Sequence, residues 1–277
     1  MKRRVANILH EQLAPGRSPV RPWLAGEIAI MLILIRVYDY VRSLAATRRS
    51  AAEHNGQQIL RLEQYLHLDL EQGTNHWLAA HHVVQALAAG WYQFAHLSFA
   101  LGAFLWCYAF RPRCYRALRN ALIMINMVGL VVFAVTPVMP PRLLPFMHYV
   151  DSVAAAGFGT SPEGPVPADQ YGAMPSLHIA WALWVAAAFI LSGRRQERWL
   201  WCLYPVVTAV VVVVTANHYV LDVVAGAVTG GTALWIAFRL LPRFRRRTGA
   251  IQMTRRRHNT NATQAPGTRG PQTVTIR

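Results

Sequence analysis

Six long apolar stretches constrain the fold of this 277-residue chain more than any other feature. A helix needs about 20 predominantly apolar residues to cross roughly 30 Å of hydrocarbon. Only 14% of the residues are charged, whereas soluble domains carry about 25%. The sequence therefore predicts an all-α, polytopic membrane protein with six transmembrane helices. They are expected near residues 24–41, 87–110, 120–138, 175–192, 199–215 and 220–241.

The segment between the first two spans, residues 42–86, is too polar to lie in lipid. Within it, apolar residues alternate with polar ones, among them Glu63 and Glu71. The apolar residues are Ile59, Leu60, Leu62, Leu66, Leu68 and Leu70. This pattern predicts an extra amphipathic helix at the membrane interface, and a soluble cap helix is the alternative. Whether the segment forms a lid is left open by the sequence.

The formal net charge of +16 is distributed in short arginine clusters between the spans. Nucleic-acid binding is not expected, because no zinc-finger or RNA-binding signature accompanies these clusters. The arginines follow the positive-inside rule if both termini are cytoplasmic. We therefore expect a basic cytoplasmic N-terminus (1–22), a six-span domain (23–241) and a basic disordered cytoplasmic tail (242–277). Lys2 is the only lysine, and this arginine bias suggests the plasma membrane of a GC-rich bacterium.

Two short motifs carry the chemistry: Met174-Pro175-Ser176-Leu177-His178 and Asn217-His218-Tyr219-Val220-Leu221-Asp222. Each places a histidine where an apolar span begins, and ionisable groups at that depth are functional candidates. Asp222 lies one helical turn after His218, so its carboxylate can hold one tautomer of that imidazole. The predicted topology brings both histidines to the extracytoplasmic face.

The outer loop before the first motif supplies Arg142, in the sequence Pro140-Pro141-Arg142. A guanidinium group suits phosphate because it forms paired, charge-assisted hydrogen bonds. Pro175 fits the first turn of a helix, whose free amides attract anions, and Ser176 adds a hydroxyl donor. Together with the two histidines, these residues predict a phosphoryl-transfer site. The three cysteines have no metal-binding spacing, so no metal or cofactor is expected.

The paired motifs, in this order and on one face, resemble the type 2 phosphatidic acid phosphatase superfamily. The Met-Pro-Ser-Leu-His and His-Tyr-x-x-Asp variants are most similar to its inositolphosphotransferase-like branch, which includes inositol phosphorylceramide synthase. The resemblance covers roughly residues 24–241. It implies that His218 attacks phosphorus and becomes a phosphohistidine, that Asp222 orients it, and that His178 is the general acid and base. It also implies that Arg142 and Ser176 hold the phosphoryl oxygens, with no metal.

One departure from the family pattern concerns the phosphate charge. Most members carry an arginine six residues before the nucleophilic histidine, and here that position is Val212. The family's usual first motif, which contains a lysine, is also absent. Arg119 is expected at the inner end of its span, too far away to substitute. We therefore assign Arg36, with Arg42, as the additional phosphate-binding candidate at the outer end of the first span.

Other ionisable residues within the first two spans have two interpretations. His96, three residues after Gln93, is expected to form an interhelical hydrogen bond, with a substrate contact as the alternative. Glu27 and the neighbouring pair Arg36 and Asp39 fit a structural role and an active-site role equally well.

The leading hypothesis is a membrane phosphoesterase or phosphotransferase acting on a lipid phosphate or a lipid with a phosphorylated headgroup. Water as the acceptor gives a lipid phosphatase; a polyol or a lipid alcohol gives headgroup transfer. The alternative is a catalytically degenerate protein that binds or transports lipids. CDP-alcohol phosphotransferases are excluded, because the chain lacks their cluster of metal-binding aspartates. Nothing in the sequence indicates the oligomeric state.

Overall fold

The computed structural model describes residues 21–145, 147–158, 171–191 and 198–240. Nearly all of the predicted N-terminal segment 1–22 and the whole tail 242–277 lie outside these ranges. The described chain is helical and contains no strand, only an isolated bridge between Val138 and Gly172. The helices are α2 (Leu24–Ala46), α3 (Arg49–Leu66), α4 (Glu71–Ala79), α5 (His82–Gly90), α6 (His96–Phe110), α7 (Pro112–Val135), α8 (Ser152–Ala155), α9 (Leu177–Ile190), α10 (Arg198–Val214) and α11 (Val220–Trp235). Shorter turns are the π-helices η1 (Trp91–Ala95) and η4 (Ile236–Leu240) and the 3-10 turn η2 (Pro141–Leu143).

Three of the described helices are long and apolar enough to cross a membrane: His82–Phe110, Cys114–Val135 and Val220–Arg239. The first is continuous through α5, η1 and α6. The apolar helices α9 and α10 are shorter, at 14 and 17 residues. The all-α architecture is thus confirmed for the described chain, with three candidate membrane-spanning helices, and the full count of six spans stays a prediction. α7 begins eight residues before the expected boundary, because Pro112 is well suited to a first helical turn.

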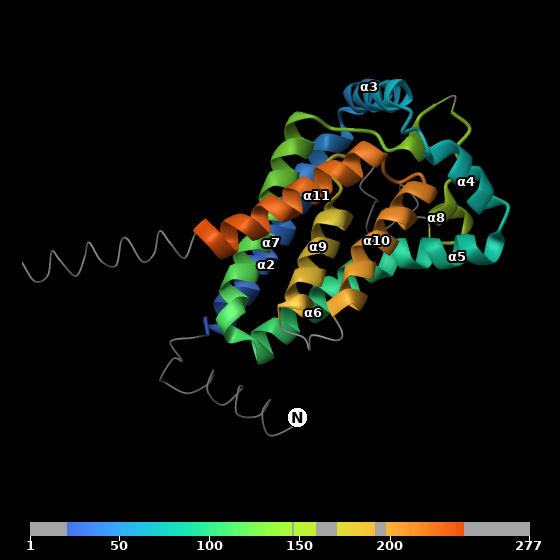
Figure 1. Ribbon diagram of the computed structural model, residues 1–277. Helices are drawn as coiled ribbons and strands as arrows, with labels where there is room; N and C mark the ends of the chain where they lie inside the picture. Colours follow the sequence, from blue (N-terminus) through green and yellow to red (C-terminus); the bar gives the residue numbers. More distant parts are fainter. Residues whose placement is uncertain (1–20, 146, 159–170, 192–197, 241–277) are drawn as a thin grey trace, which may run out of the picture.

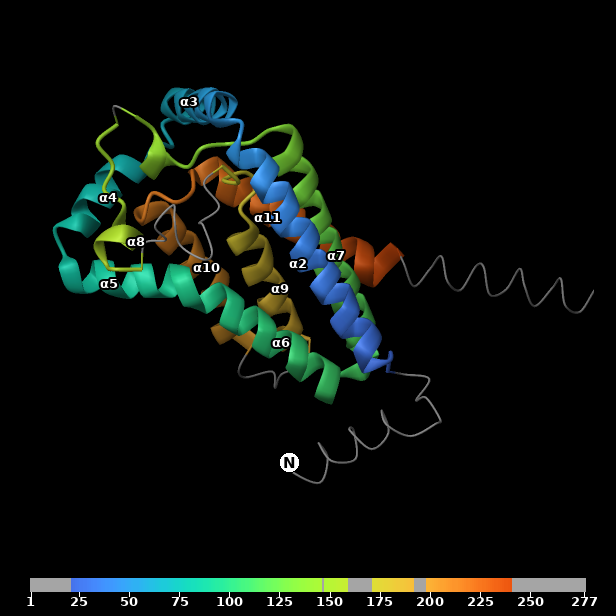
Figure 2. The same ribbon diagram turned by 180° about the vertical axis from the view of Figure 1, so that it is seen from behind.

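Helix α9 occupies the middle of the bundle and packs against α6, α7, α10 and α11 (Figures 1 and 2). Its fully buried Trp184 donates a hydrogen bond from Nε1 to the carbonyl oxygen of Leu118 on α7, at 2.8 Å. α11 approaches α9 closely because Gly226 and Gly230 face it. An added Cβ at Gly226 would lie 2.3 Å from the carbonyl oxygen of Ser176. Small residues at such crossings are typical of membrane helix pairs.

Helices α3 and α4 lie across one end of the bundle, which we call the α3 end (Figures 1 and 2). The predicted extra helix therefore exists, but it begins at Arg49 and ends at Leu66, short of Leu68 and Leu70. It stops there because His67 takes a left-handed conformation with φ 56°. Gly56 of α3 allows close packing, since an added Cβ would lie 2.7 Å from the Met139 carbonyl oxygen. Its expected location at a membrane interface stays a prediction.

Candidate active site

The α3 end contains a small cavity of about 60 Å³, room for a few water molecules. His178, at the start of α9, and His218, just before α11, both line it. Arg142 lines it from the loop after α7, and Tyr38 and Phe133 contribute walls from α2 and α7. The structure therefore brings together three of the six residues that the sequence proposed for the site and places them around one cavity.

His218 belongs to a tight turn between α10 and α11. The amides of Asn217 and His218 both donate to the carbonyl oxygen of Val212, at 3.1 Å. The His218 Nδ1–H donates to the carbonyl oxygen of Ala173 at 2.8 Å, and Oδ2 of Asp222 lies 3.4 Å from the same nitrogen. Both acceptors require hydrogen on Nδ1, so the lone pair is on Nε2. Asp222 does face His218 as expected, but the backbone of Ala173 makes the shorter contact.

Asp222 is fully buried and has a second task at the start of α11. Its Oδ2 accepts a hydrogen bond from the amide of Tyr219 at 3.0 Å. A carboxylate on the third helical residue that returns to the N-cap amide is half of a capping box. The same side chain therefore fixes the first turn of α11 and the ring of the histidine before it.

His178 meets His218 through its ring nitrogens: His178 Nδ1 lies 3.3 Å from His218 Nε2. The other nitrogen of His178, Nε2, is buried and has no hydrogen-bond partner among the described residues. One face of the ring stacks on Tyr92, with centroids 4.6 Å apart. The two imidazoles are therefore in contact at the cavity, and one ring nitrogen of His178 is still available to hold or release a proton.

His96 is a neighbour of the site, for which the sequence favoured an interhelical hydrogen bond over a substrate contact. Its Nδ1 instead bonds to the Tyr92 carbonyl oxygen within the same helix, at 3.0 Å. The His96 ring lies 4.3 Å from that of His178, centroid to centroid. The π-helical turn η1, Trp91–Ala95, directly precedes it. Such turns occur often at functional sites, but they have no simple sequence signature.

Arg142 is the only arginine or lysine among the described residues that line the cavity. Its backbone amide donates to the Ala216 carbonyl oxygen at 2.9 Å, which ties the loop to the His218 turn. The side chain is 8% exposed, and neither Nε nor Nη1 has a hydrogen-bond partner. The nearest anion is Asp151, whose Oδ2 lies 3.7 Å from Nε. Arg142 thus has donors available for a phosphate.

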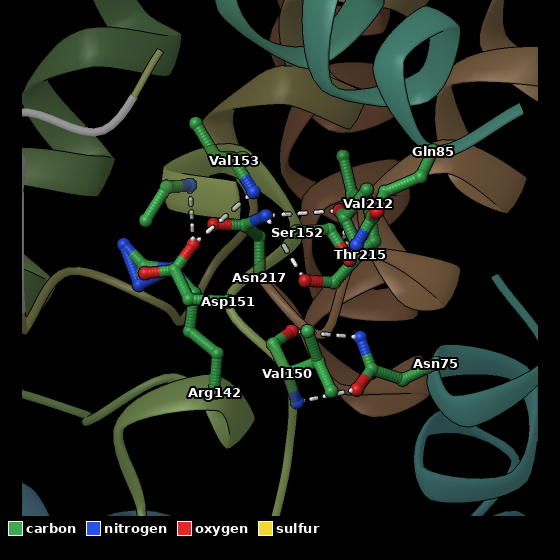
Figure 3. A network of polar contacts seen from close by, with 11 residues as sticks. Asn75, Gln85, Arg142, Val150, Asp151, Ser152, Val153, Val212, Thr215 and Asn217 are labelled. Carbon is green, nitrogen blue, oxygen red and sulfur yellow. Dashed lines mark hydrogen bonds and ion pairs between the residues drawn. The ribbon is translucent and has the colours of Figure 1, made fainter. Parts of the chain in front are cut away.

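The loop that carries Arg142 is held in place by polar side chains (Figure 3). Oδ1 of Asp151 accepts hydrogen bonds from the amides of Val153 and Ala154, so Asp151 is the N-cap of α8. Buried Asn75 of α4 accepts the amide of Val150 at 2.8 Å and donates to the Val150 and Val214 carbonyl oxygens. α4 therefore fixes the loop against the end of α10, a role for Asn75 that the sequence did not indicate.

The remaining sequence candidates whose side chains the structure describes do not line the cavity. Ser176 is fully buried before α9; its amide donates to the Asp222 carbonyl oxygen at 3.1 Å, and its Oγ has no described partner. Arg36 is exposed on α2 and does not line the cavity. The side chain of Arg42 lies outside the described part of the chain. Arg119 pairs with Glu27, on the helix that starts at the opposite end of the bundle.

Comparisons with known proteins identify a family for this chain but do not test the geometry of the site. No curated protein matches the chain. Among solved structures, it is similar to Aquifex aeolicus LpxE at 16% identity and a TM-score of 0.41, over 53% of this chain and 85% of that one. That likeness is too distant to transfer an activity. The profile of the PAP2 superfamily matches residues 57–236, which is more than half of the chain and includes both histidine motifs. The chain belongs to the PAP2 superfamily.

Proposed function

We propose that the protein is a membrane-embedded lipid phosphatase that works through a phosphohistidine on His218. One observation carries the proposal: His218 lines the cavity, and its lone pair is on Nε2 because Nδ1–H donates to the Ala173 carbonyl oxygen. A neutral imidazole held in one tautomer is a competent nucleophile toward phosphorus. Asp222 stabilises the positive charge that develops on the ring during attack.

The reaction proceeds in two displacements. His218 Nε2 forms a bond to phosphorus while the bond from phosphorus to the lipid oxygen breaks, and His178 donates a proton to that oxygen. A water molecule then attacks the phosphohistidine, His178 accepts its proton, and inorganic phosphate leaves. The 3.3 Å separation of His218 Nε2 and His178 Nδ1 supports this division of roles, since it brings the proposed acid beside the proposed nucleophile.

Arg142 is the residue we assign to the phosphoryl oxygens, because its Nε and Nη1 donors are buried and unused. Charge-assisted donors of this kind are each worth a few kcal/mol when charge develops in the transition state. Ser176 and Arg36 stay as predicted phosphate contacts. Ser176 directly precedes Leu177 and His178, which line the cavity. Arg36 does not line the cavity, so its contact with phosphate would require α2 to rotate or shift. No role is proposed for a metal.

Hydrolysis is the reaction we propose first. The cavity has room for a few water molecules beside the two histidines, and water is the acceptor in hydrolysis. Transfer to a polyol or lipid alcohol is the second candidate, favoured by the Met-Pro-Ser-Leu-His motif of the inositolphosphotransferase-like branch. We place the site on the extracytoplasmic face of a bacterial plasma membrane, since the arginine distribution favours that orientation.

The test uses the full chain purified in detergent. Phosphate release is measured on a panel of lipid phosphates in EDTA, with His218→Ala and the control His82→Ala, which changes an exposed histidine. We expect release by wild type and the control, and a loss of at least about 10³-fold in His218→Ala. Acid-labile ³²P on wild type, absent from His218→Ala, identifies the intermediate. Equal inertness of wild type and His218→Ala, with lipid still bound, would support the degenerate lipid-binding alternative.

A further inference from the structure

Three carboxylates accept hydrogen bonds from three consecutive backbone amides, those of Tyr219, Val220 and Leu221, where the chain passes from His218 into α11. Asp222 Oδ2 accepts the amide of Tyr219 at 3.0 Å. Oε1 of Glu71 accepts the amide of Val220 at 2.9 Å, and Oε1 of Glu63 accepts that of Leu221 at 2.7 Å. Amides at a helix start have no partner within the helix, and negative charge stabilises them. Two of these three partners come from α3 and α4, outside the membrane-spanning helices.

Glu63 and Glu71 lie next to one another, because they accept the amides of two consecutive residues, Val220 and Leu221. Both side chains are fully buried. The second oxygen of each, Oε2, has no donor among the described residues. A proton held by one carboxyl group supplies the donor that these neighbouring oxygens lack, and it removes the repulsion between two negative charges. Burial raises the pKa of Glu63 to about 9, and burial also raises the pKa of Glu71.

The charged and titratable groups that face this pair are acidic or phenolic. Asp222 faces it from α11, and Tyr219 from the turn before that helix. Tyr149 faces both glutamates from the loop between α7 and α8. The causes of the pKa shifts of the pair that the described residues supply include no basic side chain, and we assign the balancing positive charge to a proton.

We propose that Glu63 and Glu71 are a proton-sharing carboxyl pair that positions the catalytic turn at residues 217–222. The inference rests on the proposed function of that turn. Neither glutamate lines the cavity, so they act through the backbone. They hold Val220 and Leu221, while Ala173 and Asp222 hold the ring of His218. The ring and the start of the helix are thereby fixed relative to each other, and the distance to His178 is set.

Loss of the shared proton would leave two negative carboxylates in contact beside Asp222. Mutual repulsion then separates them, and at least one amide of α11 loses its acceptor. The catalytic turn is therefore held in place at neutral pH and released as the pH rises through about 9. His218 loses its alignment in the same range, so the rate of phosphate release should fall there.

Glutamine substitutions isolate this effect. Glu63→Gln keeps a carbonyl oxygen for Leu221 and supplies a permanent donor to Glu71 in place of the shared proton. Glu53→Gln is the matched control, on the same helix but outside the pair. We expect Glu63→Gln to keep kcat within about threefold at pH 7 and to lose the alkaline fall in kcat. Glu63→Leu, which removes the acceptor, should lower kcat at least tenfold with KM changed less than twofold.

A second measurement does not depend on activity. Hydrogen exchange of the Val220 and Leu221 amides, corrected for the intrinsic rate, reports directly whether their hydrogen bonds to Glu71 and Glu63 are formed. In wild type and Glu53→Gln, protection should drop about tenfold or more between pH 7 and 10, and in Glu63→Gln it should stay constant. Constant protection in wild type, or the same drop in Glu63→Gln, overturns the proposal. Protection that behaves as expected in a chain that releases no phosphate overturns the proposed function alone.

Discussion

The closest contact between α9 and α11 offers a direct test of how the two histidines are aligned. An added Cβ at Gly226 would lie 2.3 Å from the Ser176 carbonyl oxygen, whereas ordinary contact begins at 3.4 Å. The Ser176 backbone cannot move out of the way alone, because its amide is bonded to the Asp222 carbonyl oxygen. Gly226→Ala must therefore separate the starts of the two helices by about 1 Å. These starts carry His178 and Asp222.

A displacement of about 1 Å in a reacting group lowers rates by roughly 10²-fold. We expect Gly226→Ala to reduce kcat by about that factor, and overpacking to cost roughly 1–3 kcal/mol of stability. Two glycines on the same helix are graded controls. Gly230→Ala would meet Ala180 at 3.0 Å and should have an intermediate effect, while Gly231→Ala would meet nothing within 4 Å and should be neutral.

The assay is the initial rate of phosphate release in detergent, with thermal unfolding recorded for each variant. The order of activity should be Gly231→Ala, then Gly230→Ala, then Gly226→Ala. A folded Gly226→Ala variant with a rate within threefold of wild type would refute the reasoning, because the alignment of the histidines would not depend on this crossing.

Further predictions concern the phosphate contact, a buried hydroxyl and the carboxyl pair. Arg142→Lys loses the paired donors, and kcat/KM should fall about 10- to 100-fold in steady-state kinetics; full activity would argue against the contact. Tyr219→Phe leaves the Met139 carbonyl oxygen, 3.0 Å away, without its donor and should cost about 1–3 kcal/mol on denaturation; no change would show that the bond is dispensable. The pKa of Glu63 is raised from 4.5 to about 9 on folding. The folded chain therefore binds more protons between these values, and stability should fall with rising pH by up to about 1.4 kcal/mol per unit, a slope that Glu63→Gln should abolish.

The pairing of the two histidines was predictable because it depends on span order and charge distribution. Motifs about forty residues apart reach one face when a single hairpin of spans separates them. The same reasoning could not identify the Ala173 carbonyl oxygen as the partner of His218, because any residue supplies that acceptor. Arg36 shows another limit. Its position along the first span suggested how far it lies from the outer end of the helix, but not which way its side chain points. In the structure the side chain is exposed and does not line the cavity.

Glu63 and Glu71 show why the polar half of an amphipathic pattern is ambiguous. The alternation predicted an amphipathic helix in this segment, and α3 occupies part of it. In the structure Glu63 is buried on the same face as Ala52, Gly56 and Leu60, while Leu62 and Leu66 are exposed. This face packs on Met139 and on the start of α11. Only the free amides of a helix far away in the sequence make that arrangement favourable, and a local pattern does not contain them.

The contacts of α3 and α4 with α11 also govern how the protein is assembled. Glu63 and Leu221 are 158 residues apart, and Glu71 and Val220 are 149 apart. Contacts that close such long loops form late in folding, because the entropy of closure must be overcome first. During synthesis, Glu63 of α3 and Glu71 of α4 can accept the amides of α11 only after that helix has been made. A chain released before His218 contains Arg142 and His178 but lacks the proposed nucleophile and the start of α11, so incomplete translation products should release no phosphate from lipid phosphates.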